Sequence, residues 1–108
     1  MNFTDLATQF ERAESGSDSF KSLYQSSFDL MKVDPANAAG YFVVGIAAQA
    51  YVRKYEDQGV EPETADRAKA LMEGLNALVT EALSRPEAER LGLFSEAAMT
   101  YEHEIHLF

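Results

Sequence analysis

Hydrophobic residues recur along most of the chain at steps of three and four, which is the spacing of one face of an α-helix. The pattern is strongest in the fourth segment, where it comprises Ala68, Leu71, Met72, Leu75, Leu78, Val79, Ala82 and Leu83. No segment of the sequence shows the sustained alternation of apolar and polar residues that a half-buried β-strand requires. The sequence therefore predicts an all-α protein.

Prolines, glycines and polar residues divide the chain into five such segments. The predicted helices lie over residues 3–13, 20–31, 36–57, 62–83 and 86–108. The sequence leaves open whether the first two are separate helices or one helix broken at Gly16. The residues expected to cap or end helices are one of Ser17, Asp18 and Ser19, then Asp34 before Pro35, then Gly59, and finally Ser84 with Glu87 as a capping box.

The third segment is apolar on nearly all sides over residues 38–52, AAGYFVVGIAAQAYV. This run is interrupted by Gln49 and is shorter than the about 20 apolar residues of a membrane-spanning helix. It is typical of a helix at the centre of a bundle, where Gly40 and Gly45 let neighbouring helices approach closely. Short connections indicate antiparallel neighbours. The expected fold is a single domain over residues 1–108, a compact antiparallel bundle of four long helices plus a shorter N-terminal helix.

The last segment carries an apolar stripe that we expect to face the core. It comprises Leu91, Phe94, Ala98, Tyr101, Ile105 and Phe108. At about 100° per residue, His106 lies about a quarter turn from this stripe and His103 lies almost opposite it. With Glu102 these histidines are weak candidates for metal ligands, but one helix face does not offer the three or four convergent ligands that a site needs. A helix C-terminus also favours histidine electrostatically, so we expect no metal.

The composition of the chain indicates which classes of partner it can bind. The chain has 9 basic and 18 acidic residues, for a formal net charge of −9. Nucleic acids and anionic membranes both attract basic surfaces, so neither is an expected partner, whereas a basic protein is. The chain has no cysteine, which excludes disulfides and thiolate catalysis. The opening residues, MNFTDLATQFERAE, lack the cationic and apolar regions of a secretory signal, so we expect a cytoplasmic location.

The sequence lacks three common catalytic and nucleotide-binding motifs. The sequence contains no G-x-S-x-G elbow, no P-loop and no G-x-G-x-x-G fingerprint. The carboxylate pairs Glu61/Glu63 and Glu87/Glu89 stand at helix starts, where the helix dipole accounts for them. We therefore expect a protein that is not an enzyme and has no cofactor.

The stretch KVDPANAAGYFVVGIA, residues 32–47, resembles the junction between two tetratricopeptide repeats. The residues that carry the resemblance are Asp34, Pro35, Asn37, Ala38, Tyr41 and Gly45. The helix that follows continues about two turns beyond the family's pattern, and the 34-residue period does not recur. Peptide binding by an array of repeats is therefore not carried over to this chain.

The best candidate for a functional surface is the segment EDQGVEPETAD, residues 56–66, which contains five acids and no base. The expected partner-binding residues are Tyr51, Tyr55, Glu56, Asp57, Glu61, Glu63 and Asp66. Charge of one sign steers association, and tyrosine is enriched at interfaces. We thus expect a small acidic protein of bacterial type that masks or inhibits a basic protein partner, as an immunity protein, antitoxin or secretion chaperone does.

Two alternatives stay open at this point. A self-associating structural or adaptor subunit, such as a homodimer, would use an apolar seam formed by Leu107 and Phe108 with Phe3 and Phe10. A ligand- or metal-binding bundle would use His103 and His106. A two-fold interface through the terminal helices would favour the first alternative, and an ion beside the histidines would favour the second.

Overall fold

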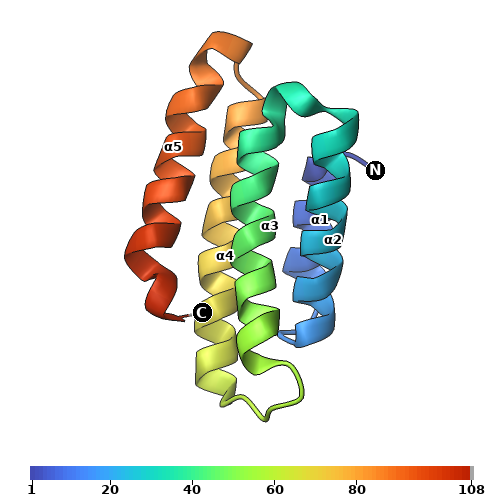
Figure 1. Cartoon of the computed structure of the whole chain (residues 1–108), viewed down its shortest axis with the longest axis vertical. Coiled ribbons are helices and arrows are strands. Elements are labelled where there is room, and N and C mark those ends of the chain that lie inside the picture. The colour runs from blue at the N-terminus through green and yellow to red at the C-terminus, as the bar shows by residue number, and fades with distance from the viewer. Residues whose placement is uncertain (108) are drawn as a thin grey trace.

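The computed structural model describes residues 1–107, with Leu107 described by its backbone alone. These residues form five α-helices and two short 3-10 helices and contain no strand, which confirms the all-α bundle. The helices are α1 (Phe3–Arg12), α2 (Ser17–Val33), η1 (Pro35–Asn37), α3 (Ala38–Tyr55), α4 (Pro62–Leu83), α5 (Glu87–Glu104) and η2 (Ile105–Leu107). The first two predicted helices are thus separate. The chain reverses its direction at each connection between α-helices (Figure 1).

Helix α3 lies at the centre of the arrangement, as its apolar sequence indicated (Figure 1). It contacts α2 most extensively and also packs against α4 and α5. The short helix α1 is seated between α2 and α4. None of the helices in residues 1–107 combines the length and the apolarity that crossing a membrane would require.

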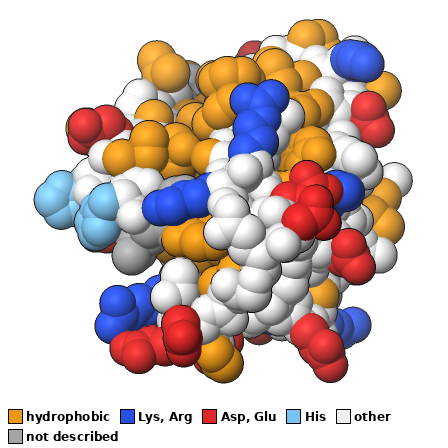
Figure 2. All heavy atoms as spheres, turned by 60° about the horizontal axis from the view of Figure 1, so that its bottom comes forward, with side chains coloured by type: hydrophobic (Ala, Val, Ile, Leu, Met, Phe, Trp, Pro, Cys, Tyr) orange, Lys and Arg blue, Asp and Glu red, His pale blue; other side chains and the backbone are white. Residues whose placement is uncertain are grey.

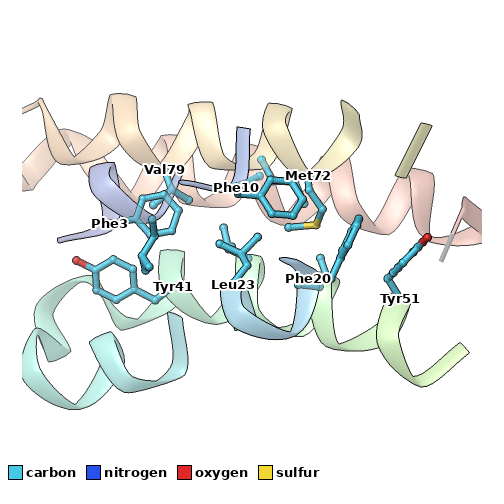
Figure 3. Packing of buried hydrophobic residues seen from close by; sticks show 14 of the residues in the cluster. Phe3, Phe10, Phe20, Leu23, Tyr41, Tyr51, Met72 and Val79 are labelled. Atoms are coloured by element: carbon cyan, nitrogen blue, oxygen red, sulfur yellow. The ribbon is translucent and has the colours of Figure 1, made fainter. Parts of the chain in front are cut away.

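Aromatic residues from three helices meet in the core (Figure 3). The Phe20 ring of α2 stacks on the Tyr51 ring of α3 with centroids 4.0 Å apart, and it meets the Phe10 ring of α1 edge-on at 5.1 Å. All three residues are buried, together with Leu75 and Met72 of α4. One continuous core therefore joins α1, α2, α3 and α4.

Two glycines of α3 allow close approach of neighbouring helices, as expected from the sequence. A Cβ atom on Gly40 would lie 2.5 Å from Cε1 of Phe94 in α5. A Cβ atom on Gly45 would lie 2.3 Å from Cε1 of Phe28 in α2. Because real Cβ atoms do not tolerate such distances, each glycine fixes how near an aromatic ring comes to the backbone of α3.

Several predicted helix ends are wrong. Helix α2 begins after Gly16 with no side-chain cap, and the Ser19 hydroxyl donates to the Gly16 carbonyl instead. Ser84 ends α4 and donates to the Glu81 carbonyl, so it does not open a capping box for α5. Side chains that can cap the next helix can equally bond to the preceding one, and the sequence does not tell these two uses apart.

The ends of α1 and α3 also differ from expectation. Asn2 and Asp5 form a reciprocal capping box at the start of α1, which the sequence reading missed. Helix α3 ends at Tyr55, two residues early, and the left-handed residue that follows is Asp57, with φ of 65°, and not Gly59. Aspartate is one of the few residues besides glycine that adopt this conformation readily.

The predicted core face of α5 is partly wrong. Phe94 and Ala97 are buried, whereas Leu91 is 69% exposed and Ile105 is 51% exposed. Ala98 is exposed as well, and Phe108 lies outside the described residues. The centre of the buried face, given by Phe94 and Ala97, is rotated by roughly 40° from the centre of the apolar stripe, at 100° per residue. The reason is that α5 packs against both α3 and α4 along a line set by Phe94 against Gly40.

A polar network ties the corner between α2 and α3 to α5. The carboxylate of Asp34 accepts hydrogen bonds from the Tyr41 hydroxyl at 2.6 Å and from Nδ2 of Asn37 at 2.8 Å. Nη1 of Arg90 in α5 donates to Oδ1 of Asn37 at 3.1 Å. Asp34 therefore acts through its tertiary contacts and makes no side-chain cap to the turn that Pro35 opens, which corrects the prediction from sequence.

This network predicts a pH-dependent contribution to stability. The hydrogen bond from Tyr41, followed by the one from Asn37, lowers the pKa of Asp34 below its usual value. A carboxyl group with a lowered pKa in the folded state stabilises the fold above its unfolded pKa of about 3.9, and the contribution is lost as the pH falls through the folded value. Urea unfolding should therefore show that Asp34→Asn lowers the free energy of unfolding at pH 7, with a smaller difference at pH 3.

The matched control for this measurement is Asp29→Asn, which removes an exposed carboxylate from the same helix. It should change the free energy of unfolding little at either pH. A loss in Asp34→Asn that stayed constant from pH 7 to pH 3 would show that the ionised carboxylate does not stabilise the corner.

Candidate functional site

The acidic residues expected to bind a partner lie at and after the end of α3, on the connection to α4, at the bottom of Figure 1. Glu56, Asp57, Glu61 and Glu63 are all exposed, and so is Asp66 in the first turns of α4. Asp57 and Glu61 have no hydrogen-bond or ion-pair partner among the described side chains. The structure thus brings the predicted carboxylates together at one end of the bundle.

Basic residues from outside this segment partly neutralise it. Nζ of Lys21 in α2 lies 3.1 Å from Oε1 of Glu56, and Nη2 of Arg67 lies 2.7 Å from Oε1 of Glu63. The hydrogen bond to Glu56 raises the pKa of Lys21. Asp66 accepts a hydrogen bond of 3.1 Å from the Ser15 hydroxyl. The acidic end is therefore less negative than five uncompensated acids would make it, and Figure 2, which looks toward this end, shows basic side chains among the acidic ones.

The two predicted tyrosines have different environments. Tyr51 is 1% exposed and stacks on Phe20, so its ring belongs to the core and offers no surface to a partner. Tyr55 is half-buried and packs against Tyr51 with ring centroids 5.0 Å apart. Of the two, only Tyr55 can contribute to a contact surface. The sequence did not separate them because they lie one helical turn apart on the same side of α3.

The C-terminal histidines lie at the surface. His103, His106 and Glu102 are all exposed. Nε2 of His103 lies 4.0 Å from Oε1 of its neighbour Glu104. Across residues 1–107, no three His, Asp or Glu side chains are grouped closely enough to hold a metal ion.

A polar groove that the sequence reading missed runs between α1 and α4. We call it the α1–α4 groove; it has a volume of about 440 Å³. Its lining residues are Thr4, Ala7, Thr8 and Glu11 of α1, with Glu73, Asn76, Ala77, Thr80 and Glu81 of α4. Asn76 is only 3% exposed, and neither Nδ2 nor Oδ1 of its amide has a hydrogen-bond partner in the described structure. The buried hydroxyl of Thr80 is also unpaired there.

The signal that could have revealed this groove is the position of Asn76 in the sequence. It stands beside Leu75 within the strongest apolar stripe of the chain, where a polar side chain must be buried. A buried amide normally has partners, so a polar residue at such a position indicates a hydrogen-bond network or a binding site. The sequence could not show that α1 would leave the amide without a partner.

The groove has a negative rim. Glu11 of α1 and Glu73 of α4 have no ion-pair partner among the described residues, whereas Oε1 of Glu81 lies 2.9 Å from Nη2 of Arg85. None of the nine described side chains that line the groove is basic. The nearby Lys69 donates to the main-chain carbonyls of Glu11 and Ala13 at the end of α1. The groove therefore combines unpaired carboxylates with unpaired hydrogen-bonding groups.

Large apolar side chains are exposed on α3 and α5. Phe42 of α3 is 47% exposed and Met99 of α5 is 66% exposed, in addition to Leu91 and Ile105. Figure 2 shows hydrophobic side chains gathered in the upper part of the view. By contrast, Phe3 and Phe10, which were expected to form an apolar seam with Leu107 and Phe108, are buried in the core. Phe108 and the side chain of Leu107 lie outside the described residues.

Comparisons with known proteins give no family assignment. No family model, no curated protein and no solved structure matches this chain significantly. The candidate function is therefore argued from the residues and their geometry alone.

Proposed function

We propose that this protein acts by binding another protein, with a basic surface, and not by catalysis. By covering that surface it would mask or inhibit the partner, as an immunity protein, an antitoxin or a secretion chaperone does. The observation that carries the proposal is the group of exposed carboxylates on the α3–α4 connection, with half-buried Tyr55 beside them.

The ion pairs already present at this end do not prevent such binding. Glu56 with Lys21 and Glu63 with Arg67 are exposed pairs, and solvent and salt weaken pairs of this kind so that they contribute little to stability. A partner that presents several basic side chains can replace them. The formal net charge of −9 also raises the rate at which a basic partner is encountered, and this effect weakens as salt is added.

Charge reversal tests the proposal directly. The variant that changes Glu56, Asp57, Glu61 and Glu63 to lysine should keep its helical circular dichroism, because all four residues are exposed. Asp57, whose left-handed conformation lysine adopts less readily, lies on the connection and not within a helix. Tagged parent protein should retain one stoichiometric basic protein from the native host's lysate at low salt and release it at high salt. The variant should retain none of it.

A control variant with the same change of net charge shows whether binding depends on this surface or on the net charge of the whole molecule. It reverses Asp29, Glu87, Glu96 and Glu102, which are exposed and lie on other parts of the bundle. The control should still retain the partner. Its lower net charge should attract the partner less strongly over long range, so that retention depends less on salt. If both variants lost the partner equally, the acidic end would not be the binding surface.

A self-associating subunit is the second candidate, favoured by the exposed apolar side chains of α3 and α5. Phe42, Leu91, Met99 and Ile105 would be covered in a dimer, and apolar residues are enriched at the centre of such interfaces. Sedimentation of the purified protein over a range of concentrations distinguishes the two candidates. A constant monomer mass supports the binder, and a dimer whose mass is insensitive to salt supports self-association.

A further inference from the structure

Two residues that line the α1–α4 groove, Asn76 and Thr80, have buried polar atoms that no other described group satisfies. Nδ2 and Oδ1 of Asn76 and Oγ1 of Thr80 are buried without hydrogen-bond partners in the described structure. Buried polar groups are almost always paired, because an unpaired one loses its bonds to water and gains nothing in return. Three such atoms in one groove indicate a ligand that supplies the missing bonds.

The charges at the rim indicate whether that ligand is positively or negatively charged. Glu11 and Glu73 stand on opposite walls of the groove, one on α1 and one on α4, and no described basic side chain pairs with either. Glu81 adds a third carboxylate, which is bonded to Arg85. Lys69 does not line the groove, and its ammonium group donates to the main-chain carbonyls of Glu11 and Ala13. The charges of the lining residues therefore favour a cation.

The hydrogen-bond donors and acceptors in the groove indicate which cationic group the ligand carries. Oδ1 of Asn76, Oγ1 of Thr80 and the carboxylates of Glu11 and Glu73 offer several acceptors around one volume. A guanidinium group has five donors in a planar fork and matches several acceptors at once, better than the three donors of an ammonium group. Nδ2 of Asn76 is a donor and needs an acceptor, which a guanidinium lacks and a main-chain carbonyl provides.

We propose that the α1–α4 groove binds an arginine side chain of a protein partner, together with a main-chain carbonyl beside it. Identifying the source as a protein rests on the proposed function above, whereas the preference for a guanidinium group rests on the groove alone. The volume of about 440 Å³ lies within the range of small-molecule sites. The polar atoms of Asn76 and Thr80 are almost fully covered, so the side chains above them must shift for the ligand to reach them.

The experiment uses small probes and the whole chain. The probe is N-acetyl-arginine-N-methylamide, titrated into ¹⁵N-labelled protein while the side-chain amide resonances of Asn76 are followed by NMR. These resonances should shift, together with backbone amides of residues 4–11 and 73–81. The citrulline analogue, which is close in shape but uncharged, should not shift them. Agmatine has a guanidinium and a second, ammonium charge but no carbonyl group, and it should bind more weakly than the arginine probe despite that second charge.

Two pairs of variants test the assignment of residues. Glu11→Gln with Glu73→Gln should weaken probe binding by at least about tenfold, because charge-assisted hydrogen bonds are lost. Glu96→Gln with Glu102→Gln on α5 removes the same charge from an exposed surface and should leave binding nearly unchanged. Asn76→Leu and Thr80→Val should each abolish or weaken binding without lowering the thermal midpoint, since each removes an unpaired buried group.

Several results would overturn the proposal. An unchanged Asn76 resonance at millimolar probe, or equal loss of binding in the two double glutamine variants, would show that the groove is not a guanidinium site. Equal binding of agmatine would reassign the site to a free guanidinium compound. A folding defect in Asn76→Leu would show that the amide is needed for the fold. Because these probes do not involve the α3–α4 connection, failure here is distinguishable from failure of the acidic-end variant.

Discussion

Replacing Phe20 with alanine is expected to lower the free energy of unfolding by about 3–5 kcal/mol, the range found for large aromatic residues in well-packed cores. Phe20 has no exposed surface, and it stacks on Tyr51 while meeting Phe10 edge-on. Its removal would leave a cavity between α1, α2 and α3 that the remaining rings cannot fill. Small domains are stabilised by only about 5–15 kcal/mol in total, so urea unfolding should show a large decrease in the midpoint.

The control for this substitution is Phe42→Ala on α3. Phe42 is among the exposed large apolar residues, and its nearest ring contact is Phe28 at 6.4 Å between centroids. Its loss should cost about 1–2 kcal/mol, clearly less than the loss of Phe20, because only about half of the side chain is removed from water. If the two variants lost similar stability, the central aromatic cluster would not be the main part of the core.

The second large effect is expected for Leu75→Ala, at about 2–5 kcal/mol. Leu75 is fully buried in α4 and belongs to the same core as Phe20. Its matched control is Leu91→Ala on α5, which makes the same chemical change at an exposed position. The control should change the free energy of unfolding by less than about 0.5 kcal/mol, since surface substitutions of this kind rarely do more.

The comparison of the two leucines tests how α5 is rotated against the bundle. A loss above about 2 kcal/mol for Leu91→Ala would mean that the apolar stripe of α5 does face the core, as its sequence suggested. A small loss in both variants would mean that the buried face of α4 is misplaced too. Chemical unfolding of all three proteins under one condition is enough to decide.

The unpaired polar atoms of the α1–α4 groove lower the stability of the isolated protein. Leaving a buried donor or acceptor unpaired costs about 1–3 kcal/mol, and Asn76 and Thr80 leave three such atoms in one place. An apolar side chain at position 76 would continue the stripe of Met72, Leu75 and Val79. The amide therefore has a cost to the isolated protein that a bound ligand would remove.

Much of the architecture could be predicted from the sequence because it depends on local spacing. The periodicity around Leu75 identified a buried helix, and Pro62 marked its first residue. The apolar run containing Gly40 and Gly45 identified the central helix. These features follow from the geometry of a single helix, in which residues three and four apart share a face whatever surrounds them.

The bundle, its central helix and the grouping of carboxylates near Glu61 were determined by the sequence alone, since each depends on residues close together in the chain. Tertiary packing decided the rest. It set the face of α5 through Phe94 against Gly40, it brought Lys21 to Glu56, and it left Asn76 without a partner below α1. These are contacts between residues far apart in the sequence, and which side chain meets which depends on how the helices fill space together, so spacing within one helix cannot specify them.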